Sequence, residues 1–351
     1  MKTILPVASG KGGVGKTMFT ANLGVALAQA GKTCILVDLD LGSSNLHTCL
    51  GIKNRNPGIG NYIYKQQDSL ESLLIPTDTP QLYFIPGDSL LPGTANLPYF
   101  TKKKLLKELD QLVADYIILD LGAGSSYNVI DFFLISNTGL IVTTPETTAI
   151  LSSYSFLKST VFRLLYRSFP AKSPERDIIR EFISRPLEGS PQSFSHLVHI
   201  LAEHSSDSGT KAEEQLQHFF PRVILNMGNS SQDFSVGSKL REISRKNLSI
   251  PMEFIGFLPN DPGVSRSIIT RIPYVIDDPH SKFAQGIQLV ARKLTAGSFS
   301  TPPELFDDDQ DIQELQAELQ RQEQGAAGRA GSPDYGPGIS PDSSESGNGI
   351  E

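Results

Sequence analysis

Short apolar runs alternate with segments of helical periodicity along most of this chain. Continuous apolar runs of strand length lie at residues 2–8, 33–38, 82–86, 116–121, 139–144, 222–227 and 253–258. Between or after these runs, apolar side chains recur every three or four positions at residues 19–30, 102–114, 147–165, 236–246 and 280–294. Runs without polar alternation are typical of strands covered on both faces, as in parallel sheets. The pattern therefore predicts an α/β fold: a doubly wound, mostly parallel sheet flanked by helices.

Two stretches depart from this alternation. Residues 168–221 are polar and contain several prolines, so we expect an insertion with one or two small helices. After residue 298 the composition shifts to Pro, Asp, Gln, Ser and Gly. Within this tail, residues 311–324 suit a short polar helix, and disorder is expected from residue 325 onward. The predicted organisation is one domain over residues 1–298, which contains the insertion, and an acidic, mostly disordered tail over residues 299–351.

The net charge of −7 over 351 residues is carried by the tail. From Glu304 onward there are 12 acidic residues and 2 arginines, whereas the preceding part has 26 acidic and 29 basic residues. The body is therefore close to neutral, which neither requires nor excludes a nucleic-acid partner. No apolar run reaches the roughly 20 residues of a transmembrane helix, and the N-terminus lacks a signal cleavage site. Because two cysteines also suit a reducing compartment, we expect a cytoplasmic protein with no integral membrane segment.

The most specific local motif joins the first predicted strand to the first predicted helix. Residues 10–17 fit the P-loop pattern G-x-x-x-x-G-K-[ST], in the strand–loop–helix context that this motif requires. Its glycines let backbone N–H groups surround phosphate oxygens, and the helix N-terminus adds a positive end. We expect Lys16 to reach the β- and γ-phosphates and the Thr17 hydroxyl to bind Mg²⁺. The predicted nucleotide-binding residues here are Gly10, Lys11, Gly12, Gly13, Val14, Gly15, Lys16, Thr17 and Met18.

Two aspartates stand near the ends of predicted strands. Asp38 and Asp120 each follow an apolar run, and ligands of open α/β sheets bind outside the carboxyl ends of the strands. A buried carboxylate is costly unless it is paired or binds a metal. Both aspartates are therefore candidate Mg²⁺ ligands together with Thr17. A capping or turn role for either aspartate is the alternative.

Lys11 is a second lysine inside the loop, and phosphate binding within one subunit does not need its charge. The charge would be used if the side chain reached the nucleotide of a neighbouring subunit, as an arginine finger does. A solvated loop lysine is the other interpretation.

Several blocks of the sequence, taken together, are similar to those of one protein family. These blocks are residues 11–17, 37–42 with Asn45, 116–124, 143–147 and 259–262. In that order they resemble a deviant Walker A loop, a first switch, a Walker B strand with a second switch, a strand-to-helix junction and a late Pro–Asn–Asp–Pro segment. The chain resembles the MinD/ParA family of SIMIBI-class P-loop ATPases, in its FlhG/MinD-like branch. The resemblance covers residues 1–165 and 222–296.

The resemblance implies a slow ATPase with ATP and Mg²⁺ as its cofactors. Lys16 would act on the nucleotide of its own subunit, Lys11 would contact the phosphates of the partner subunit, and Asp40 would polarise the attacking water. Asp38 and Asp120 would hold the Mg²⁺ shell. Further residues are implied at matching positions: Asn45, Gly122 and Glu146 in the switch segments, and Asn226, Pro259, Asn260 and Asp261 around the adenine.

The same resemblance implies a homodimer that forms with ATP and acts as a switch. We expect it to regulate spatial organisation in a bacterial cell, such as flagellar number or placement or division-site choice. It would do so through an unidentified protein partner, which would recruit it to a pole, a membrane or the nucleoid.

A ParA-like partitioning ATPase that makes weak, non-specific DNA contacts is the alternative. The basic residues of its C-terminal half would make these contacts: Lys239, Arg241, Arg245, Lys246, Arg266 and Arg271. A solvated helix face explains the same residues without DNA.

Two other patterns are weaker. Residues 87–90 (Gly-Asp-Ser-Leu) with His280 mimic a hydrolase pair, and we interpret this match as incidental. His196, His199 and His204 have loose spacing and no neighbouring cysteine, so a metal site is not expected there.

The two cysteines argue against two related groups of ATPases, and the tail argues against a membrane anchor. Cys34 and Cys49 form no C-x-x-C pair, which argues against the related iron–sulfur carriers and tail-anchored-protein targeting ATPases. The apolar stripe in residues 311–324 is surrounded by acidic residues, which anionic lipid would repel. We therefore expect no amphipathic membrane anchor in this segment.

Overall fold

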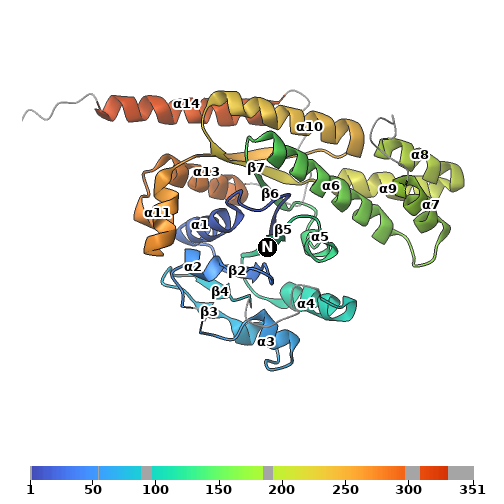
Figure 1. Cartoon of the computed structure of the whole chain (residues 1–351), viewed down its shortest axis with the longest axis horizontal. Coiled ribbons are helices and arrows are strands. Elements are labelled where there is room, and N and C mark those ends of the chain that lie inside the picture. The colour runs from blue at the N-terminus through green and yellow to red at the C-terminus, as the bar shows by residue number, and fades with distance from the viewer. Residues whose placement is uncertain (1, 54, 88–96, 185–192, 297–308, 331–351) are drawn as a thin grey trace, which may run out of the picture.

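The computed structural model describes residues 2–53, 55–87, 97–184, 193–296 and 309–330, and the side chains only as far as residue 321. An eight-stranded sheet with the order β3-β4-β2-β5-β1-β6-β7-β8 forms its centre (Figure 1). All neighbouring strands are parallel except β3 and β4. The strands are β1 (Thr3–Ser9), β2 (Cys34–Leu39), β3 (Ile75–Pro76), β4 (Leu82–Ile85), β5 (Tyr116–Ala123), β6 (Leu140–Thr143), β7 (Arg222–Gly228) and β8 (Glu253–Pro259). The predicted α/β class and mostly parallel sheet are confirmed.

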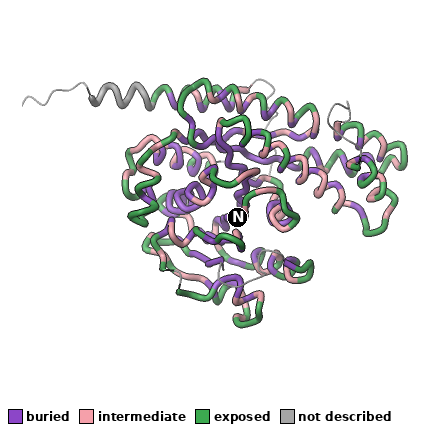
Figure 2. The backbone as a smooth tube through the Cα atoms, in the orientation of Figure 1, coloured by how far each residue is buried: buried purple, intermediate pink, exposed green. Residues whose placement is uncertain are grey.

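Helices cover both faces of this sheet. Consecutive residues of β2 alternate between two apolar clusters, with Ile35 and Val37 in one and Leu36 in the other. All six residues of β2 are buried, which is why the predicted strand shows no polar alternation (Figure 2). The Leu36 cluster is covered by α1 (Lys16–Gln29), α2 (Leu46–Cys49), α12 (Tyr274–Asp277) and α13 (Lys282–Ala296). The other is covered by α3 (Ile59–Ile63), α4 (Tyr99–Gln111), α5 (Tyr127–Phe133), α6 (Thr147–Ser168) and α10 (Phe234–Leu248).

Short elements complete the edges of the molecule. They are the 3₁₀ helices Glu71–Leu73 and Ser231–Asp233 and the helix α11 (Pro262–Thr270). The two-residue edge strand β3 was not predicted, because its apolar content is too short to form a periodic pattern.

The predicted insertion at residues 168–221 holds more helix than expected. Its described residues contain α7 (Pro174–Ser184), α8 (Phe194–His204) and α9 (Ser206–His218), where one or two small helices were predicted. Each helix carries a few apolar residues at helical spacing, such as Leu197 and Leu201, within an otherwise polar sequence. These residues join the core on the α6 side of the sheet. The average composition of the insertion concealed this narrow apolar stripe.

The tail also departs from the prediction. The helix α14 (Gln310–Ala330) extends beyond the predicted residues 311–324 and packs against β8 and α10, so this part of the tail is ordered. Its apolar stripe, formed by Ile312, Leu315 and Leu319, is buried in this contact. The stripe therefore has a partner within the chain, whereas Glu314 beside it is exposed.

A buried ion pair fastens α14 to the domain. The Asp311 carboxylate accepts hydrogen bonds from the Arg241 guanidinium (Nη2 to Oδ1, 2.6 Å) and from the backbone N–H of Phe254 (2.6 Å). Arg241 also pairs with Asp309. Both Arg241 and Asp311 are buried, so Arg241 cannot serve in the basic surface that the sequence suggested for DNA.

Replacing Arg241 with alanine is expected to lower the free energy of unfolding by about 3 kcal/mol, because Asp311 would remain buried without its cation. The measurement is urea denaturation followed by circular dichroism. The matched control is Lys246→Ala, which removes an exposed charge from the same helix and is expected to change the value by less than about 0.5 kcal/mol. Equal stability of the two variants would contradict this account of how α14 is held.

Candidate functional site

The P-loop of residues 10–17 connects β1, at the centre of the sheet, to α1. Gly13 and Gly15 both have a φ of 82°, a left-handed conformation that side chains other than glycine rarely adopt. A Cβ atom at Gly15 would also lie 2.3 Å from Nδ2 of Asn226. At Gly10 a Cβ atom would lie 2.2 Å from the backbone of Ser152 in α6. Gly13 and Gly15 are thus required by the turn and Gly10 by close packing, whereas Gly12 has neither constraint.

A cavity of 460 Å³ opens beside this loop, at the carboxyl ends of the central strands. Most of the predicted nucleotide and switch residues line it: Gly12, Gly13, Val14, Gly15, Lys16, Thr17, Met18, Asp40, Asn45, Asn226, Asn260 and Asp261. Gly10, Lys11, Pro259, Gly122 and Glu146 are not among the lining residues, and neither are the predicted magnesium ligands Asp38 and Asp120. Its size and its glycine-rich wall suit a bound nucleotide.

The cavity also exposes residues that the sequence analysis missed. Met227, Val264, Ser265 and Ile268 also line the cavity and are close in sequence to the predicted adenine contacts Asn226 and Asp261. Val264, Ser265 and Ile268 belong to α11, which follows the Pro–Asn–Asp–Pro segment directly, so their position after that motif was the available signal. Met227 has a φ of 57°, an unusual backbone conformation that no sequence pattern indicates.

Two of the predicted adenine contacts are held in place by hydrogen bonds. The side chain of Asn226 donates to the backbone carbonyl of Val14 (2.8 Å), which ties the end of β7 to the P-loop. Asp261 caps α11 by accepting from the N–H of Gly263 (2.8 Å), and the Tyr274 hydroxyl donates to its other oxygen (3.0 Å). These bonds fix the orientation of Asn226 and Asp261 before a ligand binds, as is typical of preformed ligand sites.

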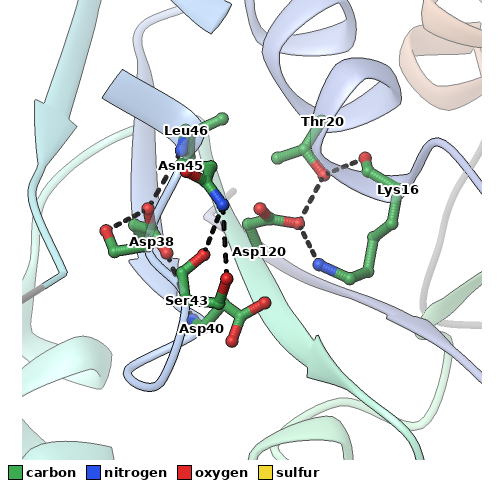
Figure 3. Close-up of polar contacts among 9 residues, drawn as sticks. Lys16, Thr20, Asp38, Asp40, Ser43, Asn45, Leu46 and Asp120 are labelled. Carbon is green, nitrogen blue, oxygen red and sulfur yellow. Dashed lines mark hydrogen bonds and ion pairs between the residues drawn. The ribbon is translucent and has the colours of Figure 1, made fainter. Parts of the chain in front are cut away.

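A buried ion pair joins the P-loop to the strand that carries Asp120. Nζ of Lys16 lies 2.7 Å from Oδ1 of Asp120, and the Thr20 hydroxyl lies 3.3 Å from the same oxygen (Figure 3). Both partners are almost fully buried. Thr20 was not predicted, although it stands one helical turn after Lys16 on α1.

Asp38 lies beside Asp120 on the neighbouring strand and accepts hydrogen bonds from the segment predicted to be the first switch. The two aspartates are paired in register between β2 and β5. Asp38 accepts hydrogen bonds from the Ser44 hydroxyl (2.6 Å) and from the N–H groups of Leu46 (3.1 Å) and Asp40 (3.1 Å). Burial, with a further contribution from Asp120, raises the pKa of Asp38 to about 7. A second cation, in addition to Lys16, would offset the cost of burying the two neighbouring carboxylates of Asp38 and Asp120. Together with Thr17 they offer the oxygen ligands that Mg²⁺ prefers.

Asp40 belongs to the first predicted switch and lies close to the second. It is half-buried and lines the cavity; burial raises its pKa, although Lys16 acts in the opposite direction. A Cβ atom at Gly122 would lie 3.4 Å from Oδ1 of Asp40, so the second switch passes close to the carboxylate. Asn45 stabilises the first switch by donating to the carbonyl of Ser43 (2.8 Å).

Lys11 does not point freely into solvent. Its Nζ lies 2.8 Å from Oε2 of Glu146 and 3.1 Å from the Thr148 hydroxyl, both at the start of α6. The side chain is thus paired at the surface, and its contact across a dimer interface stays a prediction. The contact joins two residues that the sequence analysis placed in separate motifs, and the lysine side chain remains 36% exposed.

The weaker patterns gain no support from the described part of the chain. It contains no group of three or more His, Cys, Asp or Glu side chains that could hold a metal ion, and Nε2 of His199 lies 3.3 Å from Oε1 of Glu203. Residues 88–90 of the hydrolase-like pattern lie outside the described residues. Cys34 and Cys49 are free and buried, and burial raises the pKa of each thiol to about 12. No helix among the described residues has the length and apolar character needed to cross a bilayer.

Relatives of known role share part of this sequence. The MinD septum site-determining protein of Thermotoga maritima is 36% identical over 157 residues, which are 43% of this chain and 55% of that protein. The YlxH flagellum site-determining protein of Helicobacter pylori is 31% identical over 193 residues, which are 53% of this chain and 60% of that protein. The chain thus spans little more than half the length of these relatives.

Solved structures share its fold. The MinD protein of Pyrococcus horikoshii in complex with Mg-ADP superposes with a TM-score of 0.54 at 21% identity, covering 84% of this chain and 96% of that one. MinD of Aquifex aeolicus, in a complex with MinC, superposes with a TM-score of 0.54 at 22% identity, covering 86% and 98%.

A family model described as the CobQ/CobB/MinD/ParA nucleotide binding domain matches residues 5–274. The match spans the P-loop, both aspartate-bearing strands and the wall formed by Asn226, Asn260 and Asp261. The chain belongs to this family of nucleotide-binding domains.

Proposed function

We propose that this protein is an ATP-dependent switch that dimerises when ATP and Mg²⁺ are bound and separates after slow hydrolysis. The observation that supports this most directly is the convergence of Lys16 and Asp40 on one P-loop cavity, with Lys16 held by Asp120. A site built only to hold phosphate would not need a carboxylate at the position of Asp40.

Different residues at the site have different roles in ATP hydrolysis. Thr17, Asp38 and Asp120 would hold Mg²⁺, which would supply positive charge to stabilise the phosphates. Lys16 donates to the phosphates. Asp40 orients and polarises the attacking water, and the hydrogen bond from its N–H to Asp38 fixes its backbone.

Dimer formation uses Lys11 in this proposal. To contact the phosphates of a partner subunit, Lys11 must leave Glu146 and Thr148. An exposed ion pair of this kind is worth at most about 1 kcal/mol, so its loss is a small barrier. In the monomer, the contact with Glu146 would hold the Lys11 side chain until a partner subunit binds.

The switch would control spatial organisation in a cell through a protein partner. Relatives named for septum placement and for flagellum placement support this role, as does the MinD structure solved together with MinC. ATP hydrolysis by such a switch is slow until the partner arrives, because the ATP-bound state must persist to carry a signal. The proposed place of action is the cytoplasm, with recruitment by the partner.

Light scattering without nucleotide, with ADP, and with ATP plus Mg²⁺ tests the proposal. We expect a monomer in the first two conditions and twice that mass in the third. A mass that is the same in all three conditions would contradict the switch and favour a static nucleotide-dependent scaffold.

A partition-type ATPase is the second candidate, since Lys239 and Lys246 are exposed on α10 although Arg241 is not. Sedimentation with DNA at low and high salt distinguishes the two. ATP-dependent binding that weakens steeply with salt, and that is lost in a Lys239→Ala/Lys246→Ala variant, would favour partition over a protein-mediated role.

A further inference from the structure

A second cavity lies away from the P-loop, in the helix layer on the α6 side of the sheet. It has a volume of 580 Å³ and is bordered by residues of α4, α5 and α6, and by Arg176 of α7. These helices lie together on the right of Figure 1. Five basic side chains and a single carboxylate line it: Lys102, Lys103, Arg163, Arg167, Arg176 and Asp131. We refer to this cavity as the α4–α7 pocket.

Asp131 gathers three of these cations at one point. Arg163 donates to it twice, from Nε to Oδ1 (2.7 Å) and from Nη2 to Oδ2 (2.9 Å), and Arg167 donates from Nη1 to Oδ1 (3.2 Å). Lys102 forms an ion pair with the same carboxylate. One buried negative charge therefore faces three positive charges, which leaves a local surplus. Asp131 is in this sense a positioning residue that fixes the direction of the donors.

The other two cations have no acidic partner within ion-pair distance among the residues that the structure describes. Lys103 is exposed on α4. Arg176 is oriented by its Nε, which donates to the carbonyl of Phe169 (2.9 Å), and by the ring of Tyr166, whose centroid lies 4.7 Å from its guanidinium carbon. A guanidinium has five N–H donors, so these contacts leave donors of Arg176 available to a ligand.

The arrangement has the chemistry of a site for phosphate groups. One guanidinium group can donate two parallel hydrogen bonds to two oxygens of a phosphate. A concave surface lined by one sign of charge also concentrates ligands of the opposite sign. The ammonium group of Lys102 belongs to a side chain only 9% exposed. A small anionic group that enters the cavity can approach the Lys102 ammonium group. The side of an acidic helix is too wide to enter and cannot approach it.

We propose that the α4–α7 pocket is a second anion site, separate from the P-loop, that binds a small molecule carrying several phosphate groups. Its volume lies within the range of small-molecule sites, and its surplus of four positive charges exceeds what a single phosphate needs. The proposal does not depend on ATP hydrolysis or on dimerisation.

Titration calorimetry with inorganic tripolyphosphate tests this proposal on the full chain. The informative variant is Lys103→Ala/Arg167→Ala, which leaves Asp131 paired with Lys102 and Arg163 and therefore leaves no unpaired buried charge. The matched control is Lys107→Ala/Lys158→Ala, which removes one cation from each of the same two helices outside the pocket. Both variants lose two positive charges.

We expect the pocket variant to bind tripolyphosphate at least tenfold more weakly than the wild type, and the control to stay within threefold. Equal losses in both variants would show attraction to net charge only and would overturn the proposal. An unchanged affinity in the pocket variant would overturn it as well.

Two further measurements distinguish the α4–α7 pocket from the P-loop and from a peptide-docking surface. Lys16→Ala should retain the binding that depends on Lys103 and Arg167; if it alone abolishes binding, tripolyphosphate occupies the P-loop and the proposal is wrong. A deca-glutamate peptide should not compete for the pocket. If the peptide binds through Lys103 and Arg167 while tripolyphosphate does not, the site is a docking point for an acidic protein segment instead.

Discussion

Replacing Lys16 with alanine is expected to weaken ATP binding by at least about 100-fold. Lys16 is the lysine that lines the P-loop cavity, and its Nζ lies in a buried setting where a charge-assisted hydrogen bond is not weakened by water. Losing such a contact to the phosphates costs about 3 kcal/mol, which corresponds to the stated loss of affinity. Equilibrium binding of a fluorescent ATP analogue measures it.

A stability measurement must accompany the Lys16 variant, because the substitution also removes the cation that faces Asp120. Thermal unfolding separates loss of binding from loss of fold. Lys53→Ala is the matched control, since Lys53 is exposed and does not line the cavity. We expect this control to bind ATP within about threefold of the wild type. A Lys16 variant that folds and binds like the control would contradict the assigned role.

Replacing Asp40 with alanine is expected to preserve ATP binding and to reduce hydrolysis by about 100-fold. A positioned proton acceptor contributes this order of magnitude or more, and Asp40 is the cavity-lining carboxylate that lies beside the second switch at Gly122. Because the ATP state then persists, dimers should accumulate with ATP and Mg²⁺. Phosphate release under steady-state conditions and light scattering on the same sample measure both effects.

Asp40→Asn provides the control for shape. The amide keeps the size of the side chain but cannot accept a proton. Asp40→Asn should therefore hydrolyse ATP as slowly as Asp40→Ala. Hydrolysis at the wild-type rate in Asp40→Ala would show that another group acts on the water. Recovery of activity in Asp40→Asn alone would indicate that the side chain positions the switch and does not accept a proton.

The local parts of this site could be predicted because neighbouring residues encode them. The P-loop depends on glycines whose backbone conformation is set within eight positions, and its place between a strand and a helix follows from apolar periodicity. Asp38 and Asp120 could be placed at one edge of the sheet because parallel strands present their carboxyl ends together, and the structure pairs them in register. Asn226, Asn260 and Asp261 were associated with the cavity only through the family resemblance.

What the sequence by itself determined is therefore the fold class, the P-loop and the strand-end acids. Only the tertiary structure decided which charges meet: Lys16 with Asp120, Lys11 with Glu146, and Arg241 with Asp311. It also decided that α14 packs on the domain and that five cations converge in the α4–α7 pocket. The physical reason is range, since periodicity and turn conformation act over a few residues. An ion pair between residues about 100 positions apart depends on how whole helices and strands pack.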